Sequence, residues 1–95
     1  METIFSYVYI LFSEMDKKLY VGYTANLKER LGDHFHGRVA STKKRRPLVL
    51  IHYEAFRNRI DAKAREEFLK SGFGRSQLKK ALQHILKDLE YKHLE

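Results

Sequence analysis

Polar aromatic, cationic and imidazole side chains gather in the first third of the chain. Tyr7 and Tyr9 stand two residues apart, and Tyr20, Arg30 and His34 follow within the stretch KKLYVGYTANLKERLGDHFHG. A phenol both donates and accepts hydrogen bonds, a guanidinium matches anionic oxygens, and an imidazole exchanges protons near neutral pH. Brought together, these groups would form a hydroxyl-rich site with a cation and a titratable ring beside it.

Two strands are expected to carry the tyrosines. Residues 5–12 (FSYVYILF) are aromatic and β-branched, and residues 18–23 (KLYVGY) follow after a short polar turn, so we predict an antiparallel hairpin. Tyr7 and Tyr9 then share one face of the sheet. If only the other face is packed, both tyrosines are exposed. Gly22, inside the second strand, indicates a bulge or a close approach of another group to the backbone.

A helix is predicted directly after this hairpin. Asn26 can cap it and Glu29 can complete a variant of the capping box, while Gly37 ends it. Apolar side chains recur at every fourth position and are expected to face the sheet: Leu27, Leu31 and Phe35. Arg30 and His34 then form an adjacent row with Asn26. The alternative is a solvated helix face on which Arg30 merely extends toward water.

The remaining chain completes a small mixed fold. We predict a basic loop at residues 38–46, a third strand LVLIHYEAF that begins after Pro47, and a helix at residues 61–71 that Gly72 and Gly74 stop. A last helix, capped by Ser76, carries the clearest apolar stripe: Leu78, Leu82, Ile85, Leu86 and Leu89. The order β-β-α-β-α-α predicts an α/β (α+β) domain over residues 1–95, with a three-stranded antiparallel sheet flanked by helices.

The charge balance favours a polyanionic partner. Nineteen Lys and Arg against twelve Asp and Glu give a net charge of +7, with a pI near 9.7. Four cations form one block in the predicted loop: Lys43, Lys44, Arg45 and Arg46. Such a block suits contact with nucleic-acid phosphates, which position a protein but carry no sequence information.

Several classes of protein are disfavoured. The chain has no cysteine, which excludes a disulfide framework, a thiolate zinc site and a cysteine nucleophile. No apolar run approaches the roughly 20 residues of a membrane span. The N-terminus lacks a basic leader with a small-residue cleavage site, so we expect a cytoplasmic protein.

The arrangement of short motifs resembles the GIY-YIG endonuclease superfamily. Tyr7-Val8-Tyr9 and Tyr20-Val21-Gly22 match its paired signature, and Arg30, His34 and the run from Ala62 to Glu66 fall in the expected order. The resemblance covers roughly residues 5–82, and it is strongest to the small stand-alone bacterial branch, which is similar to the N-terminal nuclease domain of the bacterial excinuclease. The chain departs from the pattern where Tyr7 replaces a glycine. It departs again at Ser71–Gln77, where two glycines stand in place of a continuing basic helix.

This resemblance implies a metal-dependent endonuclease that hydrolyses DNA phosphodiester bonds, in DNA repair or recombination. It implies one Mg²⁺ or Mn²⁺ held by Glu66, and Arg30 on the scissile phosphate. Tyr9 and Tyr20 would flank the attacking water, one of them as general base, with His34 relaying the proton. The phenol pKa of about 10 would have to be lowered by nearby cations. Gly22 would let the backbone approach the site.

Some alternatives remain open at the level of sequence. Helical periodicity does not choose between Glu66 and Glu67, and either carboxylate could simply pair with Lys63 or Lys70. The chain could also be a non-catalytic nucleic-acid-binding module of the same fold, or a protein-interaction domain. A carboxylate among the cations favours the enzyme, because a carboxylate repels phosphate and would not serve binding alone.

Overall fold

A single antiparallel sheet forms the centre of the protein, whose computed structural model describes residues 4–90. Its strands are β1 (Ser6–Ser13), β2 (Leu19–Thr24) and β3 (Leu48–Phe56), in the order β2-β1-β3. β1 is central because it is the most apolar strand, and both of its neighbours pair with it antiparallel. Its alternating side chains feed two separate apolar clusters, one on each face of the sheet.

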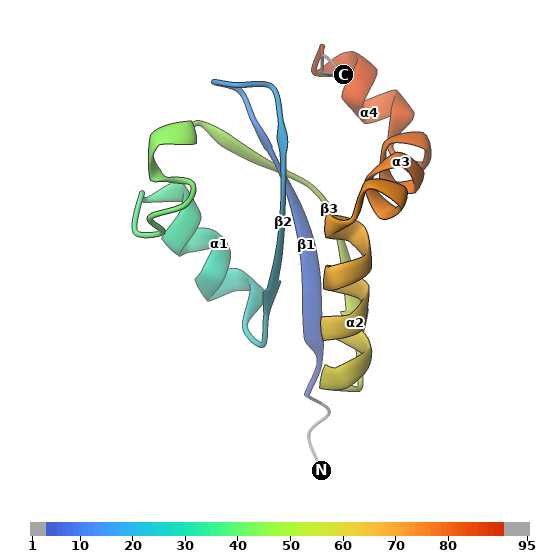
Figure 1. The fold of residues 1–95 in the computed structure, drawn as a ribbon. Helices are drawn as coiled ribbons and strands as arrows, with labels where there is room; N and C mark the ends of the chain where they lie inside the picture. Colours follow the sequence, from blue (N-terminus) through green and yellow to red (C-terminus); the bar gives the residue numbers. More distant parts are fainter. Residues whose placement is uncertain (1–3, 91–95) are drawn as a thin grey trace.

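Helices cover both faces. Figure 1 shows α1 (Leu27–Phe35) on one side of the strands and α2 (Arg59–Lys70) on the other. A 3-10 turn, η1 (Lys43–Arg45), precedes β3, and α3 (Gly72–Ala81) and α4 (Gln83–Asp88) follow α2. The α2 side holds the larger cluster, built on residues such as Ile10, Phe12 and Leu69. The predicted fold class and its element order are therefore confirmed.

The second face of the sheet is not open, which corrects one expectation. Tyr9 is 1% exposed, because Leu27 and Leu31 of α1 pack with it against Leu11. The third inward position of α1 is filled by His34, which is fully buried, and not by Phe35, which is 43% exposed. The helix is rotated relative to the predicted face, and the rotation carries its polar row toward the sheet.

The junction between α2 and α3 also differs from the prediction. Ser71 ends α2 and caps α3 by accepting a hydrogen bond from the Gly74 backbone N–H, so α3 begins before Ser76. The helices meet so closely that a Cβ on Gly74 would lie 1.8 Å from the Phe68 carbonyl oxygen. Gly74 therefore permits the packing of α3 on α2 and does not stop a helix. The predicted last helix is divided at Leu82 into α3 and α4.

The first helix after β3 begins two residues earlier than predicted. Asn58 caps α2 through its side-chain oxygen, which accepts from the backbone of Ile60 and Asp61. Between residues 4 and 90, no helix has the length and apolar character needed to cross a membrane.

Candidate active site

The Tyr9 phenol lies at the centre of the candidate site. In the β1–β2 ladder Tyr9 stands opposite Gly22, and its ring lies directly over the glycine backbone. A Cβ on Gly22 would come within 2.3 Å of Tyr9 Cζ and 2.4 Å of its hydroxyl oxygen. Gly22 thus provides a close backbone approach and not a bulge. The irregularity in the sheet falls instead between β1 and β3, at Ile10 and Leu11.

His34 connects Tyr9 to the loop that follows α1. Its Nε2 lies 2.7 Å from the Tyr9 hydroxyl, and its Nδ1 lies 2.7 Å from Thr42 Oγ1. Arg30 lies close enough to Tyr9 to lower the pKa of its hydroxyl, and a guanidinium can act only as a hydrogen-bond donor. The phenol proton is then left for His34 Nε2, and we assign the imidazole proton to Nδ1, which donates to Thr42. Burial, reinforced by the positive charge of Arg30, lowers the pKa of His34 to about 4, so the ring is neutral at physiological pH.

Burial and Arg30 act on Tyr9 in opposite directions. Burial raises the pKa of Tyr9, and it outweighs the hydrogen bond and charge of Arg30, which lower that pKa. The expected lowering by a cation is present, but the resting phenol still keeps its proton. Tyr9 is therefore poised as a hydrogen-bonding group between a guanidinium and a neutral imidazole.

Tyr20 completes the aromatic part of the site on the side nearer to solvent. Its ring centroid lies 5.2 Å from that of His34 and 6.4 Å from that of Tyr9. Its hydroxyl accepts a 3.4 Å hydrogen bond from Ser41 Oγ. Because Tyr9 is buried and Tyr20 is only partly so, a ligand would meet the Tyr20 hydroxyl first.

Glu66 approaches this cluster from α2. Its side chain is only 13% exposed, and its negative charge is among the causes that raise the pKa of Tyr9. Glu67, on the neighbouring position, is exposed to solvent. The pairing anticipated for either carboxylate is present at Glu66, whose oxygens lie 3.8 Å from Lys63 Nζ and 3.0 Å from Lys70 Nζ.

The residues around Glu66 fit a divalent cation that is held by one carboxylate. Both carboxylate oxygens already attract positive charge, and the two ammonium groups belong to side chains more than half exposed, which can move aside. Within residues 4–90 no group of three or more His, Asp or Glu could enclose a metal. A hard cation such as Mg²⁺ keeps most of its waters and often binds through one or two carboxylates together with substrate phosphate.

The basic block preceding β3 is only partly available to a ligand. Arg45 forms a bidentate ion pair with Asp16 in the β1–β2 turn, at 2.6 Å and 3.2 Å, and so fastens the loop to the hairpin. Arg46 stacks over Gly37, which has a φ of +75°, and donates to the Lys43 carbonyl. Lys43 and Lys44 are exposed. Arg45 thus has a structural partner, and phosphate contact by the four cations of the block stays a prediction.

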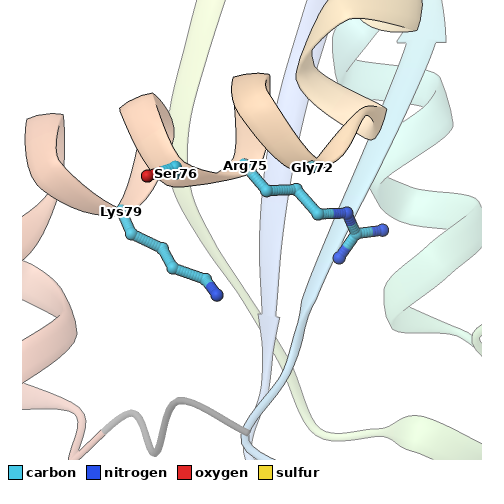
Figure 2. Close-up of a pocket in the computed structure, with 4 residues that line it drawn as sticks. All are labelled: Gly72, Arg75, Ser76 and Lys79. Atoms are coloured by element: carbon cyan, nitrogen blue, oxygen red, sulfur yellow. The ribbon is translucent and has the colours of Figure 1, made fainter. Parts of the chain in front are cut away.

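A second basic surface, on α3, was not singled out from the sequence. Figure 2 shows Arg75 and Lys79 extending from α3 on the same side, beside Gly72 and Ser76. These residues line a cavity of about 340 Å³, and the Arg75 Nε also donates to the Lys70 carbonyl. The signal in the sequence was the i, i+4 spacing of two cations in a segment without acidic residues.

Thr42 was also missed, and no local pattern could have revealed it. Its side chain is fully buried, and it contacts His34 across eight positions of sequence. The backbone N–H of Thr42 donates to the Val39 carbonyl, so a loop turn places the hydroxyl under the imidazole. A polar residue in a basic loop does not by itself indicate such a role.

The site combines a buried tyrosine that lies over a strand glycine with an arginine and a histidine from the next helix. This combination on this fold defines a class of protein. The chain belongs to the GIY-YIG family, since a family model described as the GIY-YIG catalytic domain matches residues 5–80.

Several small stand-alone bacterial relatives are similar to it. A UPF0213 protein of Pediococcus acidilactici, described as lying in the ldhD 5' region, is 42% identical over 76 residues, which is 77% of this chain and 76% of that protein. A UPF0213 protein of Staphylococcus haemolyticus is 41% identical over 78 residues, covering 81% of this chain and 93% of the relative. A Clostridium perfringens UPF0213 protein is 41% identical over 66 residues, or 68% and 70% of the two chains. No solved structure was found to match the chain.

Proposed function

We propose that this protein is an endonuclease that hydrolyses DNA phosphodiester bonds with Mg²⁺ or Mn²⁺. The observation that carries the proposal is the Tyr9 hydroxyl, held between His34 Nε2 and the Arg30 guanidinium and within reach of the charge of Glu66. Membership in a nuclease superfamily supports the reaction class. Our proposal is more specific than that reaction class in three respects. It names the metal, it names DNA as the substrate, and it places the protein in repair or recombination.

Arg30 is the residue that we expect to hold the scissile phosphate. Its hydrogen bond to Tyr9 raises the pKa of the guanidinium further, so the charge is permanent. A fixed, planar donor pair in a partly buried site stabilises charge as it builds on phosphate oxygens, without reorganisation at the moment of reaction. Glu66 would hold the divalent ion, which when bound supplies Lewis-acid stabilisation of the departing oxygen.

Tyr9 and His34 provide a route for the proton of the attacking water. Tyr9 can accept that proton while passing its own hydroxyl proton to the free lone pair of His34 Nε2, so that protons balance over the two groups. Protonating a group with a pKa of about 4 at neutral pH costs about 4 kcal/mol, which the negative charge of bound phosphate would offset. Tyr20, nearer to solvent, would orient the water.

The exposed cations favour a backbone-tracking mode of DNA binding. Lys43 and Lys44 of η1, together with Arg75 and the partly buried Lys79 on α3, are point or planar charges of the kind that contact phosphate. Such contacts position a duplex and do not specify its sequence. We therefore expect selection by DNA structure, such as a nick, flap or junction.

The test uses neighbouring carboxylates on the same helix. Glu66→Gln should abolish metal-dependent nicking, by at least about 100-fold, while DNA affinity stays within about twofold. Glu67→Gln is the matched control, because it makes the same change one position away on an exposed residue, and it should retain activity. Both are assayed on duplex, nicked, flap and junction DNA, with and without Mg²⁺ or Mn²⁺. Equal nicking by the Glu66 and Glu67 variants would refute the assignment.

The pairing of Glu66 with two lysines favours one other function, a non-catalytic binding module of the same fold. In that case the carboxylate serves only to neutralise Lys63 and Lys70. The wild-type protein would then bind the DNA panel tightly and cut none of it with any divalent metal, and Glu66→Gln would increase affinity by leaving two lysines unpaired.

A further inference from the structure

A cavity of about 370 Å³ lies between the end of β2 and the first turns of α2, outside the cluster around Tyr9. Its lining consists of Tyr23, Arg59, Ile60 and Lys63. Tyr23 also packs against the apolar cluster of the α2 face, so the floor of the cavity is held by the core. Ile60 stands at its rim with 74% of its surface exposed.

The lining combines two kinds of surface that a nucleotide needs. Tyr23 and Ile60 offer an aromatic ring and an aliphatic side chain, on which a base can stack regardless of its identity. Arg59 and Lys63 are one helical turn apart on α2 and offer two cations for phosphate. Asp61, the acidic residue in the first turn of α2, is not part of the lining.

Lys63 joins this cavity to the candidate active site. Its ammonium lies 4.7 Å from the centroid of the Tyr23 ring and 3.8 Å from Glu66 Oε1. A strand whose scissile phosphate sits near Arg30 and Glu66 would therefore pass its neighbouring nucleotide over Lys63. A phosphate there would also draw the ammonium away from Glu66, leaving that oxygen for a cation.

We propose that the cavity lined by Tyr23, Arg59, Ile60 and Lys63 binds the nucleotide that flanks the scissile phosphate, with its base on Tyr23 and Ile60 and its phosphate on Arg59 and Lys63. The inference rests on the proposed nuclease function and names a second contact of the same substrate. It assigns to Arg59 and Ile60 a positioning role, through binding energy gained away from the bond that breaks.

The experiment is an NMR titration that requires no cleavage. The probe is thymidine 3',5'-bisphosphate, which carries one base between two phosphates, and the parallel arms are thymidine alone and inorganic phosphate alone. The bisphosphate should shift the Ile60 methyl and Tyr23 ring resonances, and neither separate component should reproduce those shifts at the same concentration. Saturating shifts with inorganic phosphate alone would overturn the proposal in favour of a simple anion site.

Paired variants test the lining residues. Arg59→Gln should weaken bisphosphate binding at least about fivefold, the loss of one charge-assisted contact. Arg57→Gln makes the same charge change on an exposed residue outside the cavity, and it should stay within about twofold. Ile60→Ala removes the exposed apolar rim at little risk to folding and should reduce the shift of the Tyr23 ring.

The proposal fails if Arg57→Gln and Arg59→Gln weaken binding equally, or if no resonance of the lining moves. Neither result depends on nicking activity. Absence of nicking by the wild-type protein would refute the proposed function while leaving the titration to decide the cavity.

Discussion

The buried imidazole of His34 should make the stability of the fold depend on pH. Its pKa falls from 6.5 to about 4 on folding, because burial and the charge of Arg30 disfavour the imidazolium. The unfolded chain therefore takes up this proton at a higher pH than the folded chain. The stabilisation is complete above about pH 6.5 and is lost as the pH falls toward 4. At about 1.4 kcal/mol for each pKa unit, the full loss is about 3.4 kcal/mol, of which about 2 kcal/mol would be gone by pH 5.

The assay compares wild type with His34→Gln by urea unfolding at pH 7.5 and pH 5. Circular dichroism is the suitable signal, because the chain has no tryptophan. Wild type should lose about 2 kcal/mol more than the variant between the two pH values. Asp16 and Glu54 also add a small loss of stability at low pH, because hydrogen bonds from their arginine partners outweigh burial and hold their pKa values below the usual range. Both carboxylates are present in wild type and variant, so this loss cancels in the comparison.

An equal loss of stability between pH 7.5 and pH 5 in wild type and His34→Gln would refute this reasoning. Should the variant fail to fold, an NMR titration of wild type decides the matter, because the His34 ring should remain neutral down to about pH 5. An imidazole that titrates near 6.5 would show that burial and the charge of Arg30 do not disfavour the imidazolium of His34. The pH dependence expected from a buried neutral ring would then be absent.

Three further predictions concern the glycine beneath the site and the basic block. Gly22→Ala should displace the Tyr9 ring and break its hydrogen bond to His34. The free energy of unfolding, measured by heat or urea, should fall by about 1–3 kcal/mol, and most of any nicking activity should be lost. Unchanged stability and activity would contradict the close contact. The double variant Lys43→Gln/Lys44→Gln should keep its stability within about 0.5 kcal/mol of wild type. On duplex DNA, fluorescence anisotropy should show that the slope of log affinity against log salt decreases in magnitude by about 2. An unchanged slope would show that these residues do not contact DNA. Arg45→Gln should instead lower the free energy of unfolding by about 1 kcal/mol, because it removes the ion pair with Asp16. A loss of DNA affinity with no loss of stability would show instead that Arg45 contacts the ligand.

Local patterns were sufficient to predict the order of the elements and much of the site. Secondary structure depends largely on residues that are close in sequence. The alternation around Tyr7 and Tyr9 predicts a strand, and the i, i+4 spacing of Leu27 and Leu31 predicts a helix. Gly22 was recognised as special for the same reason, since a glycine within a strand costs stability unless something occupies the space of a side chain.

Local patterns failed where two elements meet. Spacing placed Phe35 inward, but the rotation of α1 on the sheet buries His34 in its place, because Tyr9 and Thr42 satisfy both ring nitrogens there. The N-cap of α3 was misplaced at Ser76, because the contact of Gly74 with the Phe68 carbonyl joins two helices that look separated in sequence.

By itself, the sequence determined the strands and helices, the basic character and the residue types available for phosphodiester chemistry. Only the tertiary structure decided that Arg45 is bound to Asp16, that Glu66 rather than Glu67 is partly buried near Tyr9, and that Tyr9 keeps its proton. The physical reason is that burial and charge–charge distances depend on packing between segments far apart in the chain, and these quantities set both the pKa of a group and its access to a ligand.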